Sequence, residues 1–406
     1  MFRSSLLAFA LGLTLSGPLL TPATAQEEGE EGDEELTPAK RLRMEAFEKV
    51  KARDYAGAIE KFKKSLEHDP GHPDTLFHVG QMYHAQNKLA EAVGWYDKAI
   101  YAMPGHHMAY HNRGVARSAL GKLEDALKDL DESIVLRPQY SRGWHSRAQV
   151  HIMLGNDEEA IADCTEAIKR SPKFASAWHS RAIARMRLGQ VKEAEEDVVE
   201  ACSQIPGMAT WVFRRGFARM RLGKLKEALA DYTQSIEMGE KDAEGKQQRP
   251  LSDYMKARAY SSRAQVHFLL GDQKKALADM AEAMKLTPDH AYSPLWVRAF
   301  KGDAGAALKR LSKHAYEQDD DKWIQQIIRY YLGEIDRPKL LGIAERAEEE
   351  KQRRERLCQA HCYAGMLHEV KGEQKEATAQ YKLSVAQKAY GYTEHWWAET
   401  RLETLK

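Results

Sequence analysis

The sequence predicts an all-α protein built from tandem helical hairpins, and three observations support this fold class. The first is a residue pattern that returns after 34 residues: Trp144, Ala148, Ala160, Ala167 and Pro172 are followed by Trp178, Ala182, Ala194, Ala201 and Pro206. The second is the spacing of apolar residues at steps of three and four, which is typical of amphipathic helices. The third is the glycine or proline at the breaks between helices. We therefore expect one elongated solenoid rather than two or three compact domains.

The stretch 141–172 holds one complete repeat with two predicted helices. Trp144 begins the buried stripe of the first helix, and Gly155 ends that helix because glycine adopts the left-handed cap conformation without strain. We expect Asp157 to cap the second helix and Pro172 to end the unit. A 34-residue period with this order of large, small and closing residues is typical of the tetratricopeptide repeat (TPR).

The TPR pattern predicts a superhelical solenoid of seven repeats over residues 39–290. The period breaks near residues 239–256, which we interpret as a surface loop or a lengthened hairpin. Residues 291–357 are expected to form helices outside the repeat pattern. Residues 358–406 are expected to form one further TPR-like hairpin and a capping helix that hides the last open face of the solenoid.

The N-terminal residues have a different composition from the repeats. Residues 1–25 combine Arg3, a short apolar run and small residues before Gln26, a pattern that predicts a signal peptide cleaved near Ala25. The apolar run is shorter than the roughly 20 residues of a membrane-spanning helix. Residues 26–38 contain seven acidic residues and are expected to be a disordered leader. The sequence thus predicts an exported protein, periplasmic or secreted, without stable membrane insertion.

The acidic leader conceals a surplus of positive charge in the folded part. The whole chain has 61 basic and 60 acidic residues, and without Arg3 and the seven acids of the leader the counts are 60 and 53. A mildly basic surface could meet nucleic acid, but export argues against that partner and favours acidic proteins or envelope polymers.

Two series of charged residues recur at fixed positions. Each arginine of the first series precedes an aspartate of the second by 16 residues: Arg113 and Asp129, Arg147 and Asp163, Arg181 and Asp197, Arg215 and Asp231, Arg263 and Asp279. The series could be a basic ladder for a ligand or a set of internal ion pairs. The first repeat holds Glu45 and Lys61 there and the second Val79 and Trp95, so that the charges reverse or vanish together. This covariation favours structural ion pairs.

A second set of recurrent residues is expected to face outward from the first helices. We predict that these residues line a peptide groove: Phe77, Gln81, His111, Asn112, His145, Gln149, His179 and Phe213. Aromatic, imidazole and amide groups suit an extended polypeptide better than a phosphate. The histidines could also respond to pH near neutrality. The alternative interpretation is that they are duplicated spacer residues without a ligand.

Motifs of the common enzyme classes are absent from the sequence: GxSxG, HExxH, the phosphate-binding P-loop and the glycine-rich dinucleotide turn. Cys358, His361 and Cys362 share a helical face in outline, but a closed zinc site needs four ligands and no fourth is evident. We therefore expect no metal and no cofactor. Cys164 and Cys202 fall on inner helical stripes and are expected to be buried.

The C-terminal third resembles a known family. The segments SPLWVRA, YLGEI and CYAGMLHEVKGEQKEATAQYKLSVAQKAYGYTEHWWAETRLETL are similar to the end of NlpI-type bacterial envelope proteins, which are TPR lipoproteins and adaptors. The resemblance implies partners such as a tail-specific protease or cell-wall hydrolases, and it implies a homodimer. This chain departs from the family in lacking the lipid-bearing cysteine and in having more repeats.

The function that the sequence favours is therefore that of a non-catalytic exported scaffold or adaptor. It would bind extended polypeptide segments in its TPR groove and bring envelope proteins together. The alternative is a metal-assisted envelope enzyme that uses Cys358, His361 and Cys362.

Overall fold

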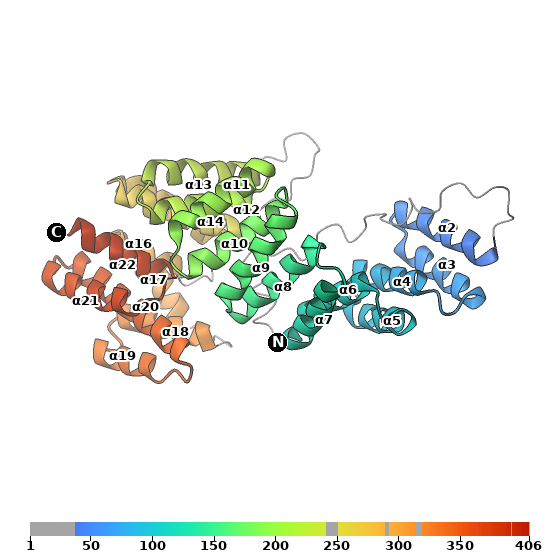
Figure 1. Cartoon of the computed structure of the whole chain (residues 1–406). Coiled ribbons are helices and arrows are strands. Elements are labelled where there is room, and N and C mark those ends of the chain that lie inside the picture. The colour runs from blue at the N-terminus through green and yellow to red at the C-terminus, as the bar shows by residue number, and fades with distance from the viewer. Residues whose placement is uncertain (1–36, 241–250, 289–291, 313–318, 391, 406) are drawn as a thin grey trace. The chain divides into compact units, whose positions relative to one another are not determined.

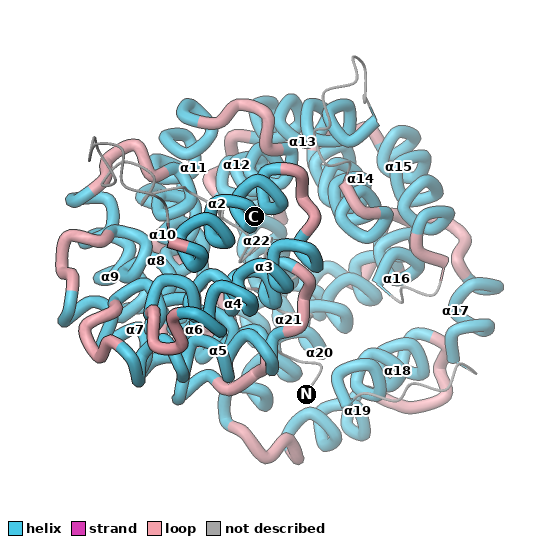
Figure 2. Tube along the Cα trace, turned by 90° about the vertical axis from the view of Figure 1, so that its right-hand side faces the viewer, coloured by secondary structure: helices cyan, strands magenta, loops and turns pink. Residues whose placement is uncertain are grey.

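The computed structural model describes residues 37–240, 251–288, 292–312, 319–390 and 392–405, and within these ranges the chain forms helices and no strands (Figures 1 and 2). The predicted signal peptide, nearly all of the acidic leader and residues 241–250 of the insertion lie outside the described residues. No described helix is long and apolar enough to cross a bilayer. The chain divides into two compact units, 1–184 and 185–406, and each is described by itself.

Unit 1 consists of consecutive antiparallel hairpins in the order of the sequence (Figure 1). Its helices are α2 Pro38–Lys51, α3 Tyr55–His68, α4 Pro73–Ala85, α5 Leu89–Ala102, α6 His107–Ala119, α7 Leu123–Leu136, α8 Ser141–Leu154, α9 Asp157–Arg170 and the first part of α10 Ala175–Arg187. The boundary between the units falls within α10. These helices form repeats 1 to 4 and begin repeat 5.

Local sequence explains the ends of these helices. Gly155 follows α8 with φ 84°, the left-handed cap that the sequence predicts. Repeat 2 makes the same turn with Asn87, at φ 60°. Proline stands at the first position of α2 and α4, where its missing N–H costs nothing. One detail differs from the prediction: Asn156 holds the N-cap position of α9, and Asp157 is the first residue of the helix.

Small residues allow the two helices of a hairpin to lie in contact. Gly80 in α4 faces the ring of Tyr96 in α5, and a Cβ at Gly80 would lie 2.6 Å from Tyr96 Cε1. Gly114 in α6 likewise leaves no room for a Cβ beside Leu130. Ala148 and Ala160 are fully buried between α8 and α9. The small positions of the repeat are thus points of close helix approach, which bury the large residues opposite them.

Unit 2 continues the hairpins and then departs from the repeat pattern. Its remaining helices are α11 Val191–Gln204, α12 Ala209–Arg221, α13 Leu225–Glu240, α14 Asp253–Leu269, α15 Gln273–Leu286, α16 Tyr292–Ala299, α17 Gly305–Ser312, α18 Asp319–Tyr331, α19 Arg337–Glu345, α20 Glu350–Val370, α21 Gln374–Ala386 and α22 Thr393–Thr404. α13 and α14 are longer than the corresponding helices of unit 1, which belongs to a lengthened hairpin around the insertion.

Helix α22 does more than cover the end of the array. Trp396 and Trp397 are both buried. The ring of Trp397 lies 4.8 Å from that of Trp296 in α16 and 5.9 Å from that of Phe268 in α14. The last helix therefore belongs to a core shared with the repeats of unit 2.

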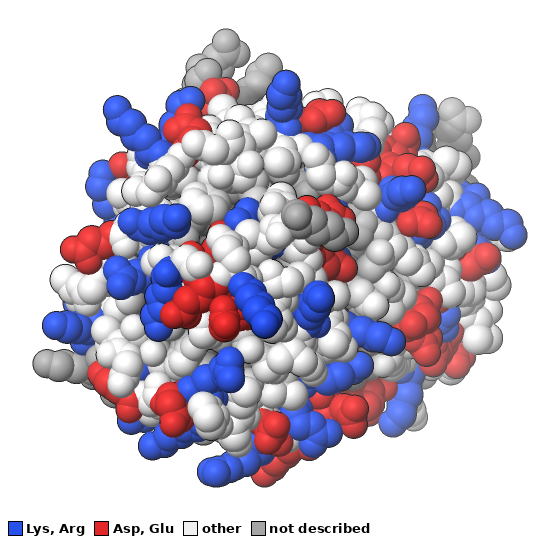
Figure 3. Space-filling view, turned by 90° about the vertical axis from the view of Figure 1, so that its left-hand side faces the viewer, with Lys and Arg blue, Asp and Glu red and all other residues white. Residues whose placement is uncertain are grey.

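Basic and acidic side chains alternate over the face of the molecule that Figure 3 shows, without a large area of one sign.

Candidate functional site

Each repeat has a group of three positions, which we call the ladder slot: two residues four apart on the first helix and one on the second. In repeat 4 it holds Arg147, His151 and Asp163. In four repeats the arginine donates two hydrogen bonds to the aspartate at 2.6 to 3.1 Å: Arg113 to Asp129, Arg147 to Asp163, Arg215 to Asp231 and Arg263 to Asp279. All four aspartates are buried. A structural role fits this geometry, because removing one partner would leave a charge buried and unpaired.

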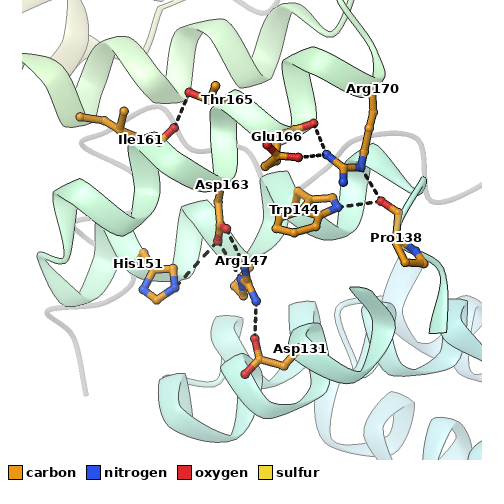
Figure 4. Close-up of polar contacts among 10 residues, drawn as sticks. All are labelled: Asp131, Pro138, Trp144, Arg147, His151, Ile161, Asp163, Thr165, Glu166 and Arg170. Carbon is orange, nitrogen blue, oxygen red and sulfur yellow. Dashed lines mark hydrogen bonds and ion pairs between the residues drawn. The ribbon is translucent and has the colours of Figure 1, made fainter. Parts of the chain in front are cut away.

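Two ladder arginines, Arg113 and Arg147, also reach the preceding repeat. Arg147 Nη1 donates to Asp131 Oδ1 at 2.6 Å, and Asp131 lies on α7, the second helix of repeat 3 (Figure 4). Arg113 makes the same contact with Asp97 at 2.6 Å. The hydrogen bond with Asp163 raises the pKa of Arg147. A single guanidinium thus joins the two helices of its own repeat to the repeat before it.

The third member of the ladder slot was not recognised in the sequence. Arg117 Nη1 donates to Asp129 at 2.8 Å, and Arg219 Nη1 donates to Asp231 at 2.9 Å. His151 Nε2 lies 3.8 Å from Asp163 Oδ2 (Figure 4). The signal that could have revealed this member is a basic residue four positions after each ladder arginine, in five repeats: Arg117, His151, Arg185, Arg219 and His267.

The pair Arg181 and Asp197 stays a prediction, because its members belong to different units. Arg181 donates to Thr165 Oγ1 at 3.1 Å within unit 1. Asp197 accepts from Arg185 Nη1 at 2.7 Å within unit 2.

The first two repeats fill the ladder slot differently. In repeat 1, Lys61 Nζ donates to Glu45 Oε2 at 2.5 Å, so the reversed pair also meets. In repeat 2 the slot holds Val79, Tyr83 and Trp95, and the two rings are stacked at 6.4 Å with an interplanar angle of 13°. Repeat 2 therefore has an aromatic pair where repeats 3 and 4 have ion pairs.

The structure corrects the predicted peptide groove. All eight residues assigned to it are buried rather than outward-facing: Phe77, Gln81, His111, Asn112, His145, Gln149, His179 and Phe213. For His111 and His145 the physical reason is contact with the next repeat of unit 1.

Two of these residues, His111 and His145, show how that contact is made. His111 Nε2 and Ser146 Oγ are 2.9 Å apart, and His145 Nε2 and Ser180 Oγ are 3.0 Å apart. The residue ahead of the next repeat packs on the same ring, as Phe174 does on His145 at 4.8 Å. The recurrent position joins neighbouring first helices in unit 1 and does not form an open surface.

Burial also changes the expected response to pH. It lowers the pKa of His111 and that of His145 to about 4, because desolvation disfavours the imidazolium. These two rings therefore do not titrate near neutrality.

Cys358, His361 and Cys362 are buried in α20. Burial raises the pKa of the Cys358 thiol to about 12, and it also raises the pKa of the Cys362 thiol well above its usual value. His361 Nδ1 lies 2.9 Å from Gln380 Oε1, and Cys358 Sγ lies 3.4 Å from Ser384 Oγ. Cys358 and His361 thus each have a polar neighbour on α21. In the described part of the chain, no group of three His, Cys, Asp or Glu side chains could hold a metal. All four cysteines are buried, and none of them forms a disulfide.

The model of one family matches this chain in three segments: residues 43–107, 111–173 and 213–291 match the tetratricopeptide repeat, and together they span about half of the chain. The chain belongs to the tetratricopeptide repeat family. TPR arrays are scaffolds for interactions between proteins. The C-terminal segments for which the sequence suggests a resemblance to NlpI-type proteins lie beyond these matches, so the resemblance stays a prediction.

Solved TPR structures are similar to this TPR protein in fold. A TPR protein from Parabacteroides merdae is 19% identical, with a TM-score of 0.47, over 72% of this chain and 98% of that one. Pseudomonas aeruginosa PilF is 13% identical, with a TM-score of 0.47, over 57% and 98%. YrrB, described as a TPR protein with an unusual peptide-binding site, is 15% identical, with a TM-score of 0.34, over 57% and 95%.

Proposed function

We propose that this TPR protein is an exported, non-catalytic adaptor that binds polypeptide segments of other proteins and assembles envelope proteins. The observation that supports this proposal best is that the repeats of unit 2 hold a polypeptide segment of the chain itself. Arg221 in α12 donates to the backbone carbonyl of Tyr390. A Cβ at Gly189, in the turn before α11, would lie 3.3 Å from the ring of Tyr390.

The same segment continues into α22, whose Trp397 packs on Phe268 of α14. The contacts combine a cation on a carbonyl, an aromatic ring over a glycine and a tilted pair of aromatic rings. These are the means by which proteins anchor a bound polypeptide. Contacts of the same kinds would be enough to hold a segment of a partner protein on other repeats.

The resemblance of the C-terminal third suggests partner classes for this adaptor: a tail-specific protease, cell-wall hydrolases and a second copy of the chain. The predicted signal peptide supports export. Nucleic acid is not a partner in this proposal.

Chemical crosslinking of the mature chain in an envelope extract, followed by mass spectrometry, tests the adaptor function. We expect discrete proteins crosslinked to the folded chain and absent from a control in which the chain is first unfolded by heat. Recovery of the same proteins with both preparations, or of none, would contradict an adaptor function.

Export is tested separately by the intact mass of the protein purified from the envelope. The proposal requires a chain that begins at Gln26 without a lipid adduct. A retained Met1 would contradict export and leave the crosslinking result unaffected.

A further inference from the structure

Repeats 1 and 2 have a surface to which the proposed adaptor function assigns no role. It consists of the half-buried rings of Tyr83 and Trp95 with three exposed lysines, Lys63, Lys88 and Lys98, and we call it the lysine–aromatic surface. Lys98 Nζ lies 4.0 Å from the centroid of the Trp95 ring. Lys63 Nζ lies 5.5 Å from that ring and donates to Tyr83 Oη at 2.9 Å. Lys88 Nζ lies 5.9 Å from the Tyr83 ring.

The register of the repeats shows what is unusual here. The position of Lys63 is that of Asp97 one repeat later, and the position of Lys98 is that of Glu132. Asp97 accepts a hydrogen bond from Arg113 at 2.6 Å, so the charge at this position is paired within the chain one repeat later. At two positions the lysine–aromatic surface therefore has a lysine where the next repeat has an acidic residue.

The charge of this surface is not compensated by the folded chain. No carboxylate of the described residues forms an ion pair with Lys63, Lys88 or Lys98, whereas neighbouring Lys61 and Lys64 pair with Glu45 and Glu60. Three ammonium groups therefore surround two ring faces without an acidic partner. Bringing carboxylates to this place would form ion pairs at a surface that already has an ordered aromatic platform.

We propose that the lysine–aromatic surface docks an extended acidic segment of a partner protein, whose carboxylates pair with the lysines while an apolar side chain lies on the exposed edge of the Trp95 and Tyr83 stack. The inference rests on the proposed adaptor function and names the chemistry of its partner. Lysine suits this role because its ammonium is a compact charge on a flexible stem that follows an irregular chain. The surface extends over α3, α4 and α5, which favours an extended segment over a single small anion.

Fluorescence anisotropy with a defined probe tests the proposal on the full mature chain. The probe is a fluorescein-labelled peptide of alternating glutamate and leucine, and its control has glutamine in place of glutamate. The triple variant Lys63→Gln, Lys88→Gln, Lys98→Gln should bind the acidic probe about fivefold more weakly, because three weak exposed ion pairs are lost together. Binding should also weaken between roughly 50 and 300 mM salt.

A matched variant separates this surface from general attraction between charges. Lys122→Gln, Lys169→Gln, Lys173→Gln removes the same charge from exposed lysines that, among the described residues, neither form ion pairs nor lie over a ring. Lys122 has the register of Lys88 one repeat later. We expect this variant to bind within about twofold of the parent. Equal weakening by the two triple variants would overturn the proposal.

Two further outcomes would also overturn it. The chain has its own acidic segment, with seven acids at residues 27–35. If the probe binds only after these acids are changed to amides, the occupant is the leader and not a partner. If single-stranded oligothymidylate binds with the same dependence on Lys63, Lys88 and Lys98, the surface is one for nucleic acid. The crosslinking experiment would retain its partners in either case, so the adaptor function is judged independently.

Discussion

Repeats 2 and 4 solve the same packing problem with opposite chemistry. In repeat 4 the ladder slot holds Arg147 and Asp163 in a bidentate ion pair. In repeat 2 it holds Val79 and Trp95, and the space is filled by an apolar side chain and a ring. The hairpin is the same in both. The comparison teaches that the repeat requires complementary side chains in the ladder slot rather than one particular residue. In repeat 2 this allows the rings of Tyr83 and Trp95 to form part of the lysine–aromatic surface.

The largest effect should come from leaving a ladder charge without its partner. Asp163→Ala leaves Arg147 without its buried carboxylate, and we expect the free energy of unfolding to fall by about 3 kcal/mol. Asp163→Ala introduced into an Arg147→Met background should cost much less, because the charge is already gone. Chemical denaturation of the four proteins of this cycle measures the difference, and equal losses in both backgrounds would exclude the pairing.

The second effect depends on pH. The unfolded imidazole has a pKa of about 6.5, and burial lowers the pKa of His145 to about 4 in the folded chain. The unfolded state therefore binds more protons in this window, and stability is lost as the pH falls from about 6.5 to about 4, by about 3 kcal/mol per histidine.

Repeat 2 has Phe77 at the position of His145, so His145→Phe introduces the apolar side chain that repeat 2 already has there. This variant should lose part of the slope of unfolding free energy against pH in that window. An unchanged slope would mean that His145 is not the group that titrates.

The third effect concerns close helix approach in repeat 2. Gly80→Ala places a Cβ 2.6 Å from the Tyr96 ring, and we expect the free energy of unfolding to fall by about 1 to 3 kcal/mol. Gly94→Ala in α5 is the control, because a Cβ there meets nothing within 4 Å and alanine favours the helix. Thermal unfolding of both variants should give shifts of opposite sign; a shared sign would remove the role of the Tyr96 contact.

The smallest effect comes from the ammonium over the Trp95 ring. Lys98→Gln removes a cation 4.0 Å from the ring centroid, which at an exposed site contributes about 0.5 to 1 kcal/mol. Lys122→Gln has no ring beneath it and should leave stability unchanged. If the two variants unfold at the same denaturant concentration, the cation–π contact contributes nothing to folding.

The all-α repeat fold was predictable because period and helix spacing are properties of one chain segment at a time. The arginine–aspartate partners were also predictable, because the residue types at the two positions change together from repeat to repeat. The groove was not predicted correctly. Whether His145 faces solvent depends on Ser180 and Phe174 of the next repeat, and the period alone does not show how closely two repeats approach. The contact of Trp397 with Phe268 joins residues far apart in the sequence, which no local pattern reveals.

The bridging arginine has a consequence for how such an array can grow. Asp129 and Asp131 lie on one helix, the first turned to the arginine of its own repeat and the second to the arginine of the next. A duplicated 34-residue unit therefore arrives with one guanidinium and two carboxylates in place, and it completes the contacts on both sides of its insertion point. Deleting a whole unit rejoins the remaining contacts in the same way, whereas a cut at any other spacing would leave a buried ion unmatched. Gene duplication by whole repeats would meet no electrostatic penalty in this part of the chain.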